Sequence, residues 1–123
     1  MAHVLIVDDD GAMRRVLSLQ LNLAGIESRE ASNAQQAFVS LKQELPDLVL
    51  LDVMMPPIDG IEICRRIRLD PATMALPVIM VSAYASDANR ERAMAAGATA
   101  LVAKPYESDT LLATLRRYLP QAV

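Results

Sequence analysis

The sequence predicts an α/β domain built on a parallel sheet. Short apolar runs alternate with segments whose apolar residues recur every three to four positions, and the pair occurs five times along 123 residues. The connections are short, and no repeat, low-complexity tract or linker interrupts them. Such alternation is typical of parallel strands joined by right-handed crossovers. Five units favour an open, doubly wound sheet, because a closed barrel needs about eight strands and about 250 residues.

Two strands and a helix are expected before residue 31. Residues 3–7 are apolar or β-branched and end at three aspartates, so we expect them to form the first strand. Apolar residues then recur at helical spacing as far as Ala24, and Gly25 supplies a natural stop. Residues 26–30 are a weaker and more polar strand candidate, as expected at the edge of a sheet.

A second helix and a fully buried strand come next. Ser32 and Gln35 have the spacing of a capping box, and apolar residues follow with a helical period up to Leu45, where Pro46 ends the helix. The run after Pro46 is nearly all apolar and ends at Asp52. A run of this length and composition is typical of a strand buried on both faces of a parallel sheet.

The second half of the chain continues the alternation. Its apolar runs are short, and its helical segments have recognisable caps and stops. The elements expected here are a helix at 59–69, a strand at 78–81, a helix capped by Ser86 or Asp87 and stopped at Gly97, a strand at 99–102 and a helix that begins at Ser108.

Composition and charge limit the class of protein. A chain that is 53% hydrophobic and 22% charged is expected to form one compact domain, here residues 1–123. Its net charge of −3 argues against direct nucleic-acid binding. One cysteine excludes an internal disulfide and suits a reducing compartment, and the first apolar run is too short to span a membrane. We therefore expect a soluble, cytoplasmic domain.

Carboxylates follow two of the expected strands. Asp8, Asp9 and Asp10 come directly after the first strand, and Asp52 ends the third. Ligands bind at the carboxyl ends of the strands in open α/β sheets, so these groups converge if the two strands are neighbours. A hard cation such as Mg²⁺ would relieve their repulsion. The alternative is that Asp8 to Asp10 form only a solvated turn and helix start, where acids favour the helix dipole.

The fourth and fifth strands are also followed by polar groups. Ser82 comes after the fourth strand and Lys104 after the fifth. Each alone is explained better by an ordinary turn serine or a surface lysine. Together with the carboxylates, they supply a nucleophile, metal ligands, a hydroxyl donor and an ammonium group, which are the parts that phosphoryl transfer needs. We interpret Asp52 as the nucleophile and the other groups as serving it.

In this order and spacing, the fragments resemble the receiver domain of two-component response regulators over essentially the whole chain. The motifs are Val4-Leu5-Ile6-Val7-Asp8-Asp9-Asp10, Asp52-x-x-Met55-Pro56-x-x-Asp59-Gly60, Val81-Ser82-Ala83, Gly97-Ala98 and Lys104-Pro105. The resemblance implies a flavodoxin-like sheet in the order 2-1-3-4-5, with helices on both faces. It also implies a cis peptide bond between Lys104 and Pro105.

The resemblance further implies that Asp52 accepts a phosphoryl group from a histidine of a partner, in a reaction that requires Mg²⁺. The partner would be a sensor histidine kinase or a histidine phosphotransfer protein. Such a domain promotes its own phosphorylation and dephosphorylation, so it is a switch rather than a conventional enzyme. The implied roles are metal binding by Asp9, Asp52 and the main-chain carbonyl of Met54, a metal contact mostly through water by Asp8, and contacts to phosphoryl oxygens by Ser82 and Lys104.

Phosphorylation would change the surface of helix four, strand five and helix five, which an output domain, a target protein or a second copy in a homodimer would contact.

Many receivers carry Tyr or Phe three residues before the lysine, whereas this chain has Leu101. A leucine there packs inward or outward without a ring to bury or a hydroxyl to bond. Met54 and Tyr84 flank the expected approach to the acyl phosphate, so we expect them to control access of water.

Two alternative functions fit less well. A phosphorylation-independent interaction module on the same fold has only Leu101 in its favour, since the acids, Ser82 and Lys104 are intact. A Mg²⁺-dependent phosphohydrolase with an aspartate nucleophile needs a second acid two residues later, where this chain has Met54. Neither a Walker lysine loop nor a glycine-rich dinucleotide loop is present in the sequence.

Other single residues have simpler explanations. His3, at the start of the first strand, is expected to be structural, and Cys64 is expected to be a buried small hydrophobe. The arginines at 65–68 are expected to form a solvated helix face. Leu19 and Leu23 fall opposite the apolar stripe of the first helix, so we expect an exposed surface there against which a kinase or phosphotransfer helix packs.

Overall fold

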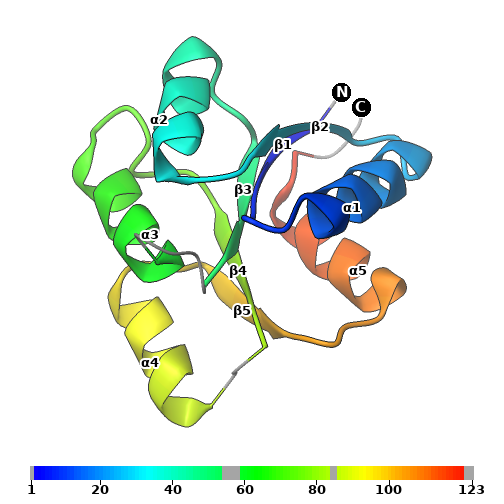
Figure 1. Cartoon of the computed structure of the whole chain (residues 1–123). Helices are drawn as coiled ribbons and strands as arrows, with labels where there is room; N and C mark the ends of the chain where they lie inside the picture. Colours follow the sequence, from blue (N-terminus) through cyan, green and yellow to red (C-terminus); the bar gives the residue numbers. More distant parts are fainter. Residues whose placement is uncertain (1, 54–58, 84–85, 121–123) are drawn as a thin grey trace.

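The middle layer is a five-stranded sheet in the order β2-β1-β3-β4-β5, in which every pair of neighbouring strands is parallel (Figure 1). The order predicted from the resemblance is confirmed. The structure, a computed structural model, describes residues 2–53, 59–83 and 86–120. The strands are β1 (His3–Val7), β2 (Glu27–Ala31), β3 (Leu48–Asp52), β4 (Val78–Ser82) and β5 (Ala100–Ala103).

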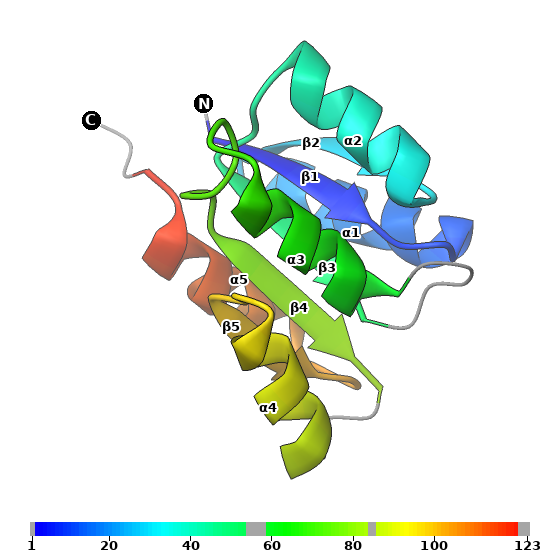
Figure 2. The same cartoon turned by 90° about the vertical axis from the view of Figure 1, so that its left-hand side faces the viewer.

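Helices cover both faces of the sheet, as Figures 1 and 2 show from two sides. One face carries α1 and α5, and the other carries α2, α3 and α4. None of the helices within the described part of the chain is long and apolar enough to cross a membrane. Their bounds are α1 (Gly11–Leu23), α2 (Ala34–Gln43), α3 (Gly60–Leu69), α4 (Asp87–Ala95) and α5 (Ser108–Tyr118).

Strand β3 lies at the centre of both cores. Leu48 and Leu50 belong to the cluster beneath α1 and α5, whereas Val49 and Leu51 belong to the cluster beneath α2, α3 and α4. Successive residues of a strand point to opposite faces, and helices cover both faces of this sheet, so all four side chains are buried. Asp52 is the last residue of β3 and lies at the carboxyl edge of the sheet, where it is only partly buried. The packing of the four apolar residues before it fixes its position.

The capping box expected at Ser32 and Gln35 is wrong by one residue. Asn33 caps α2 by accepting a hydrogen bond from the Gln36 amide, and the Gln36 side chain accepts hydrogen bonds from the amide and hydroxyl of Ser32. Both pairs have the same spacing, and asparagine is as good a cap as serine, so the sequence does not distinguish them.

Leu45 was expected in the second helix, and this is also wrong. The helix ends at Gln43, and the Leu45 side chain is 51% exposed. Leu45 precedes Pro46, whose ring disfavours helical backbone in the residue before it, and Glu44 is already extended. The apolar period therefore continues one turn further than the helix does.

The expectation that the arginines of α3 form a solvated face is wrong for Arg68, whose side chain contacts other segments of the chain. Its Nε donates a hydrogen bond to the Gly97 carbonyl at 2.8 Å. Its Nη1 donates to the carbonyls of Leu76 at 2.6 Å and Met74 at 3.1 Å, and its Nη2 approaches the Thr99 hydroxyl at 3.4 Å. This one guanidinium thus joins the end of α3 to the connections before β4 and β5, which the sequence run of arginines does not reveal.

Replacing Arg68 by Met is expected to lower the free energy of unfolding by about 2 kcal/mol, since three carbonyl oxygens lose a charged donor. Urea denaturation measures the change. Arg65→Met is the matched control, because Arg65 is exposed and pairs with Glu62 on the same helix. Equal effects of the two substitutions would contradict the structural role of Arg68.

Candidate functional site

Three carboxylates meet at the carboxyl edge of the sheet. Asp8 and Asp9 follow β1 and Asp52 ends β3, and these strands are direct neighbours. One carboxylate oxygen from each residue lies within 4.8 Å of the others. Asp8 is buried, Asp52 is largely buried and Asp9 is exposed, so the cluster opens to solvent on the Asp9 side. The convergence expected from the sequence is therefore present.

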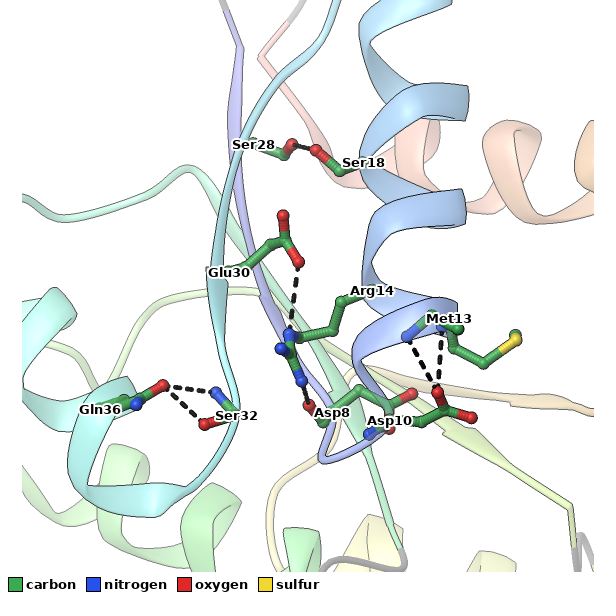
Figure 3. A network of polar contacts seen from close by, with 10 residues as sticks. Asp8, Asp10, Met13, Arg14, Ser18, Ser28, Glu30, Ser32 and Gln36 are labelled. Atoms are coloured by element: carbon green, nitrogen blue, oxygen red, sulfur yellow. Dashed lines mark hydrogen bonds and ion pairs between the residues drawn. The ribbon is translucent and has the colours of Figure 1, made fainter.

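The three acids after β1 have different roles. One side-chain oxygen of Asp10 accepts hydrogen bonds from the amides of Ala12 and Met13, which caps α1 (Figure 3). The Oδ1 of Asp8 accepts from the Asp10 amide at 2.9 Å, and its Oδ2 lies 3.8 Å from the Nζ of Lys104. The interpretation as a turn and helix start is thus correct for Asp10, whereas Asp8 faces the cluster.

Lys104 brings a positive charge to the carboxylates. Its Nζ lies 3.8 Å from an oxygen of Asp8 and 3.8 Å from an oxygen of Asp52. Its amide donates a hydrogen bond to the Ser82 carbonyl at 2.8 Å, so the ends of β4 and β5 are tied together beside the site. Ser82 itself is buried at the end of β4. The expected cis peptide bond between Lys104 and Pro105 is present.

The donor set fits a magnesium ion. Carboxylate oxygens are the hard ligands that Mg²⁺ prefers, and a divalent cation would offset the mutual repulsion of three acids, which Lys104 offsets only in part. Met54, expected to add a carbonyl ligand, and Tyr84, expected to control water, lie outside the described residues.

The backbone behind Asp52 is tightly packed against the start of α3. The Gly60 amide donates a hydrogen bond to the Val53 carbonyl at 2.7 Å, and a Cβ added to Gly60 would overlap the carbonyl oxygen of Asp52. Asp59 caps the helix by accepting from the Glu62 amide at 3.0 Å. Gly60 is part of the motif that carried the resemblance, but sequence reasoning assigned it no role. Its role is to let α3 begin directly against the Asp52 peptide.

Leu101 and Tyr106 lie on opposite faces of the sheet. Leu101 packs inward with the cluster beneath α2, α3 and α4 and is 8% exposed, which answers the question its sequence position raised. Tyr106 packs against the cluster beneath α1 and α5. Burial, with a smaller contribution from the Asp8 carboxylate, raises the pKa of the Tyr106 phenol. Tyr106 therefore stays neutral beside the site at physiological pH.

The remaining single residues behave as expected. Cys64 is fully buried, and burial raises the pKa of its thiol despite the opposing charge of Arg68. His3 accepts a hydrogen bond from the Arg29 side chain at 3.1 Å, in a structural contact away from the carboxylates. Leu19 and Leu23 are 60% and 80% exposed on α1.

The fold and this edge of the sheet define a class of protein. A parallel sheet in the order 2-1-3-4-5, with paired acids after β1, an aspartate ending β3 and a lysine after β5, is the arrangement of a response regulator receiver. The family model described as the response regulator receiver domain matches residues 4–116. The chain belongs to this family, the receiver domains of two-component response regulators.

Individual relatives support the same assignment. The phosphate regulon transcriptional regulatory protein PhoB of Pseudomonas aeruginosa is 38% identical over 94% of this chain and 51% of its own length. The chain thus spans about half the length of the curated relatives it matches.

Solved structures agree with the sequence relatives. The chemotaxis protein CheY4 of Vibrio cholerae has a TM-score of 0.91 at 32% identity, with 96% of this chain and 98% of that chain covered. The N-terminal receiver domain of RstA from Klebsiella pneumoniae, in its BeF3-activated form, has a TM-score of 0.89 at 28% identity, with 97% and 99% covered.

Proposed function

We propose that this receiver is a phosphorylation switch in which Asp52 accepts a phosphoryl group from a histidine of a sensor kinase or phosphotransfer protein. The observation that carries the proposal is the meeting of the Asp52 carboxylate with two further carboxylates and the Lys104 ammonium at one edge of the sheet. These groups come from three strand ends far apart in the sequence. Phosphoryl transfer needs such positioning and charge neutralisation rather than elaborate covalent chemistry.

In the proposed reaction, a carboxylate oxygen of Asp52 attacks the phosphorus of the phosphohistidine. The new P–O bond forms as the P–N bond breaks, and the imidazole leaves with that electron pair. Lys104, already 3.8 Å from Asp52, pairs with a phosphoryl oxygen, and the Ser82 hydroxyl donates to another. Asp8, Asp9 and Asp52 would hold Mg²⁺, which when bound neutralises charge on the phosphoryl oxygens.

The state of Asp52 is passed on through α4 and β5 in this proposal. Only Ala93 of α4 is buried, and the exposed ion pair of Arg92 with Asp59 holds this helix to the start of α3 at 3.7 Å. A helix with so little buried apolar surface costs little to move. The pull of the phosphoryl group on Ser82 and Lys104 would bias the position of α4, and thus the surface of α4, β5 and α5.

The proposed partners follow from these surfaces. A kinase or phosphotransfer helix packs on α1, which begins at the acidic edge and along which Leu19 and Leu23 are exposed. The matched part of PhoB belongs to a longer transcriptional regulator, so we propose that an output domain, a target protein or a second receiver contacts the α4, β5 and α5 surface. A cytoplasmic location stays a prediction.

Incubation with a small-molecule phosphodonor tests the function. Intact mass spectrometry is expected to show one added phosphoryl group when Mg²⁺ is present and almost none after the metal is removed with a chelator, since three carboxylates then repel the incoming phosphoryl oxygens. A wild-type protein that gains no phosphoryl group with Mg²⁺ would contradict the switch and favour a phosphorylation-independent module.

A further inference from the structure

Arg14, in the first turn of α1, turns its side chain back toward the sheet. The side chain is 17% exposed, whereas the next residue, Arg15, is exposed. The Arg14 Nη1 donates a hydrogen bond of 2.6 Å to the main-chain carbonyl of Asp8, and its Nε lies 3.3 Å from a carboxylate oxygen of Glu30 on β2. Figure 3 shows this guanidinium between the two acidic residues.

The carbonyl that Arg14 holds belongs to the peptide joining Asp8 to Asp9. The amide of Asp8 donates to the Ala31 carbonyl at 3.1 Å, and its Oδ1 accepts from the Asp10 amide at 2.9 Å. These two contacts fix the backbone before the Asp8 carbonyl, at the Asp8 amide, and the backbone after Asp9, at the Asp10 amide. Arg14 holds the Asp8–Asp9 peptide plane between them, and the direction of this plane sets the position of the Asp9 Cα, which carries the carboxylate.

We propose that Arg14 is a positioning residue for the acidic cluster, itself held by Glu30. This inference rests on the proposed function, because it concerns the Mg²⁺ site of that function. Three carboxylates within 4.8 Å repel one another, and the exposed loop after β1 is the part free to relax away. The Arg14 hydrogen bond opposes that relaxation and keeps Asp8 and Asp9 converging with Asp52.

A purely electrostatic role for Arg14 predicts the opposite sign. A cation close to a metal site repels Mg²⁺, so removing its charge would tighten Mg²⁺ binding, and replacing it by lysine would change nothing. Positioning predicts weaker binding in both cases. Lysine keeps the charge, but its single nitrogen cannot place separate atoms on Asp8 and Glu30 as the guanidinium does.

Isothermal titration calorimetry of the unphosphorylated protein with Mg²⁺ tests the proposal without any phosphotransfer. Arg14→Lys and Arg14→Met are each expected to weaken Mg²⁺ binding about 10-fold, the usual size of the effect when a residue that orients metal ligands is changed. Arg15→Met is the matched control, with the same loss of charge on the adjacent, exposed residue, and we expect a change below about twofold. Circular dichroism and urea denaturation establish whether each variant is folded. If Arg14→Met is not folded, Arg14→Lys alone tests the proposal.

Tighter or unchanged Mg²⁺ binding by folded Arg14→Lys and Arg14→Met would overturn the positioning role while leaving the proposed function intact. A wild-type protein that binds no Mg²⁺ would overturn the metal site and this inference together. An equal loss in Arg15→Met would show that the effect is general charge rather than the hold on the Asp8–Asp9 peptide, and would also overturn the proposal.

Discussion

Gly60→Ala is expected to destabilise the protein by about 3 kcal/mol, although alanine favours helices by about 1 kcal/mol over glycine. The added methyl group would overlap the main-chain carbonyl oxygen of Asp52 and lie 3.0 Å from the Val53 Cα. Neither neighbour can rotate away, since both are backbone atoms of a buried strand end. The start of α3 must move, and the hydrogen bond from the Gly60 amide to the Val53 carbonyl is lost.

Gly11→Ala is the matched control for this prediction. Gly11 also occupies the first position of a helix, α1, but the nearest atom to an added Cβ is the far end of the Arg14 side chain at 3.4 Å. We expect its unfolding midpoint in urea to stay close to that of the wild type. Similar midpoints for Gly60→Ala and wild type would show that α3 does not begin as closely against Asp52 as the structure shows.

Lys104→Met is expected to slow phosphorylation by a small-molecule phosphodonor about 100-fold, the usual effect of removing one group that stabilises transition-state charge. Its ammonium lies 3.8 Å from an oxygen of Asp8 and 3.8 Å from an oxygen of Asp52, where the phosphoryl oxygens are expected. The rate is followed by intact mass at intervals after addition of the phosphodonor and Mg²⁺.

Lys42→Met controls for the loss of a lysine. Lys42 is the other lysine of the chain and lies near the end of α2, away from the carboxyl edge. It is expected to be phosphorylated at the wild-type rate. If Lys104→Met also reacts at that rate, then its charge does not contribute to transfer, and the role given to Lys104 is wrong.

The site was predictable from the sequence because of one property of parallel sheets. All strands end at the same edge, so the polar residues that follow apolar runs must meet there once the strands are neighbours. Asp8, Asp9, Asp52 and Lys104 were placed by this argument, and their convergence is observed. The strand order itself came from the family resemblance, since periodicity carries no information about which strands pair.

The contacts that support the site were not predictable in the same way. Arg14 and Arg68 sit in helical patterns that place arginines on a solvated face, and only the folded chain shows their side chains turning back to carbonyls of other elements. The cap at Asn33 rather than Ser32 shows the same limit at short range, because two equally good caps are adjacent. Sequence patterns therefore predict where helices and strands lie, whereas the hydrogen-bond partners of a side chain depend on the elements that pack around it.

Borohydride reduction of the phosphorylated protein tests the assignment of Asp52 most directly. Hydride cleaves an aspartyl phosphate and leaves homoserine at the residue that carried the phosphoryl group. After treatment with a phosphodonor and Mg²⁺, peptide mass mapping should find homoserine at position 52 in the wild type and none in Asp52→Asn. Homoserine at position 8 or 9, or a phosphoryl adduct that persists in folded Asp52→Asn, would contradict Asp52 as the acceptor.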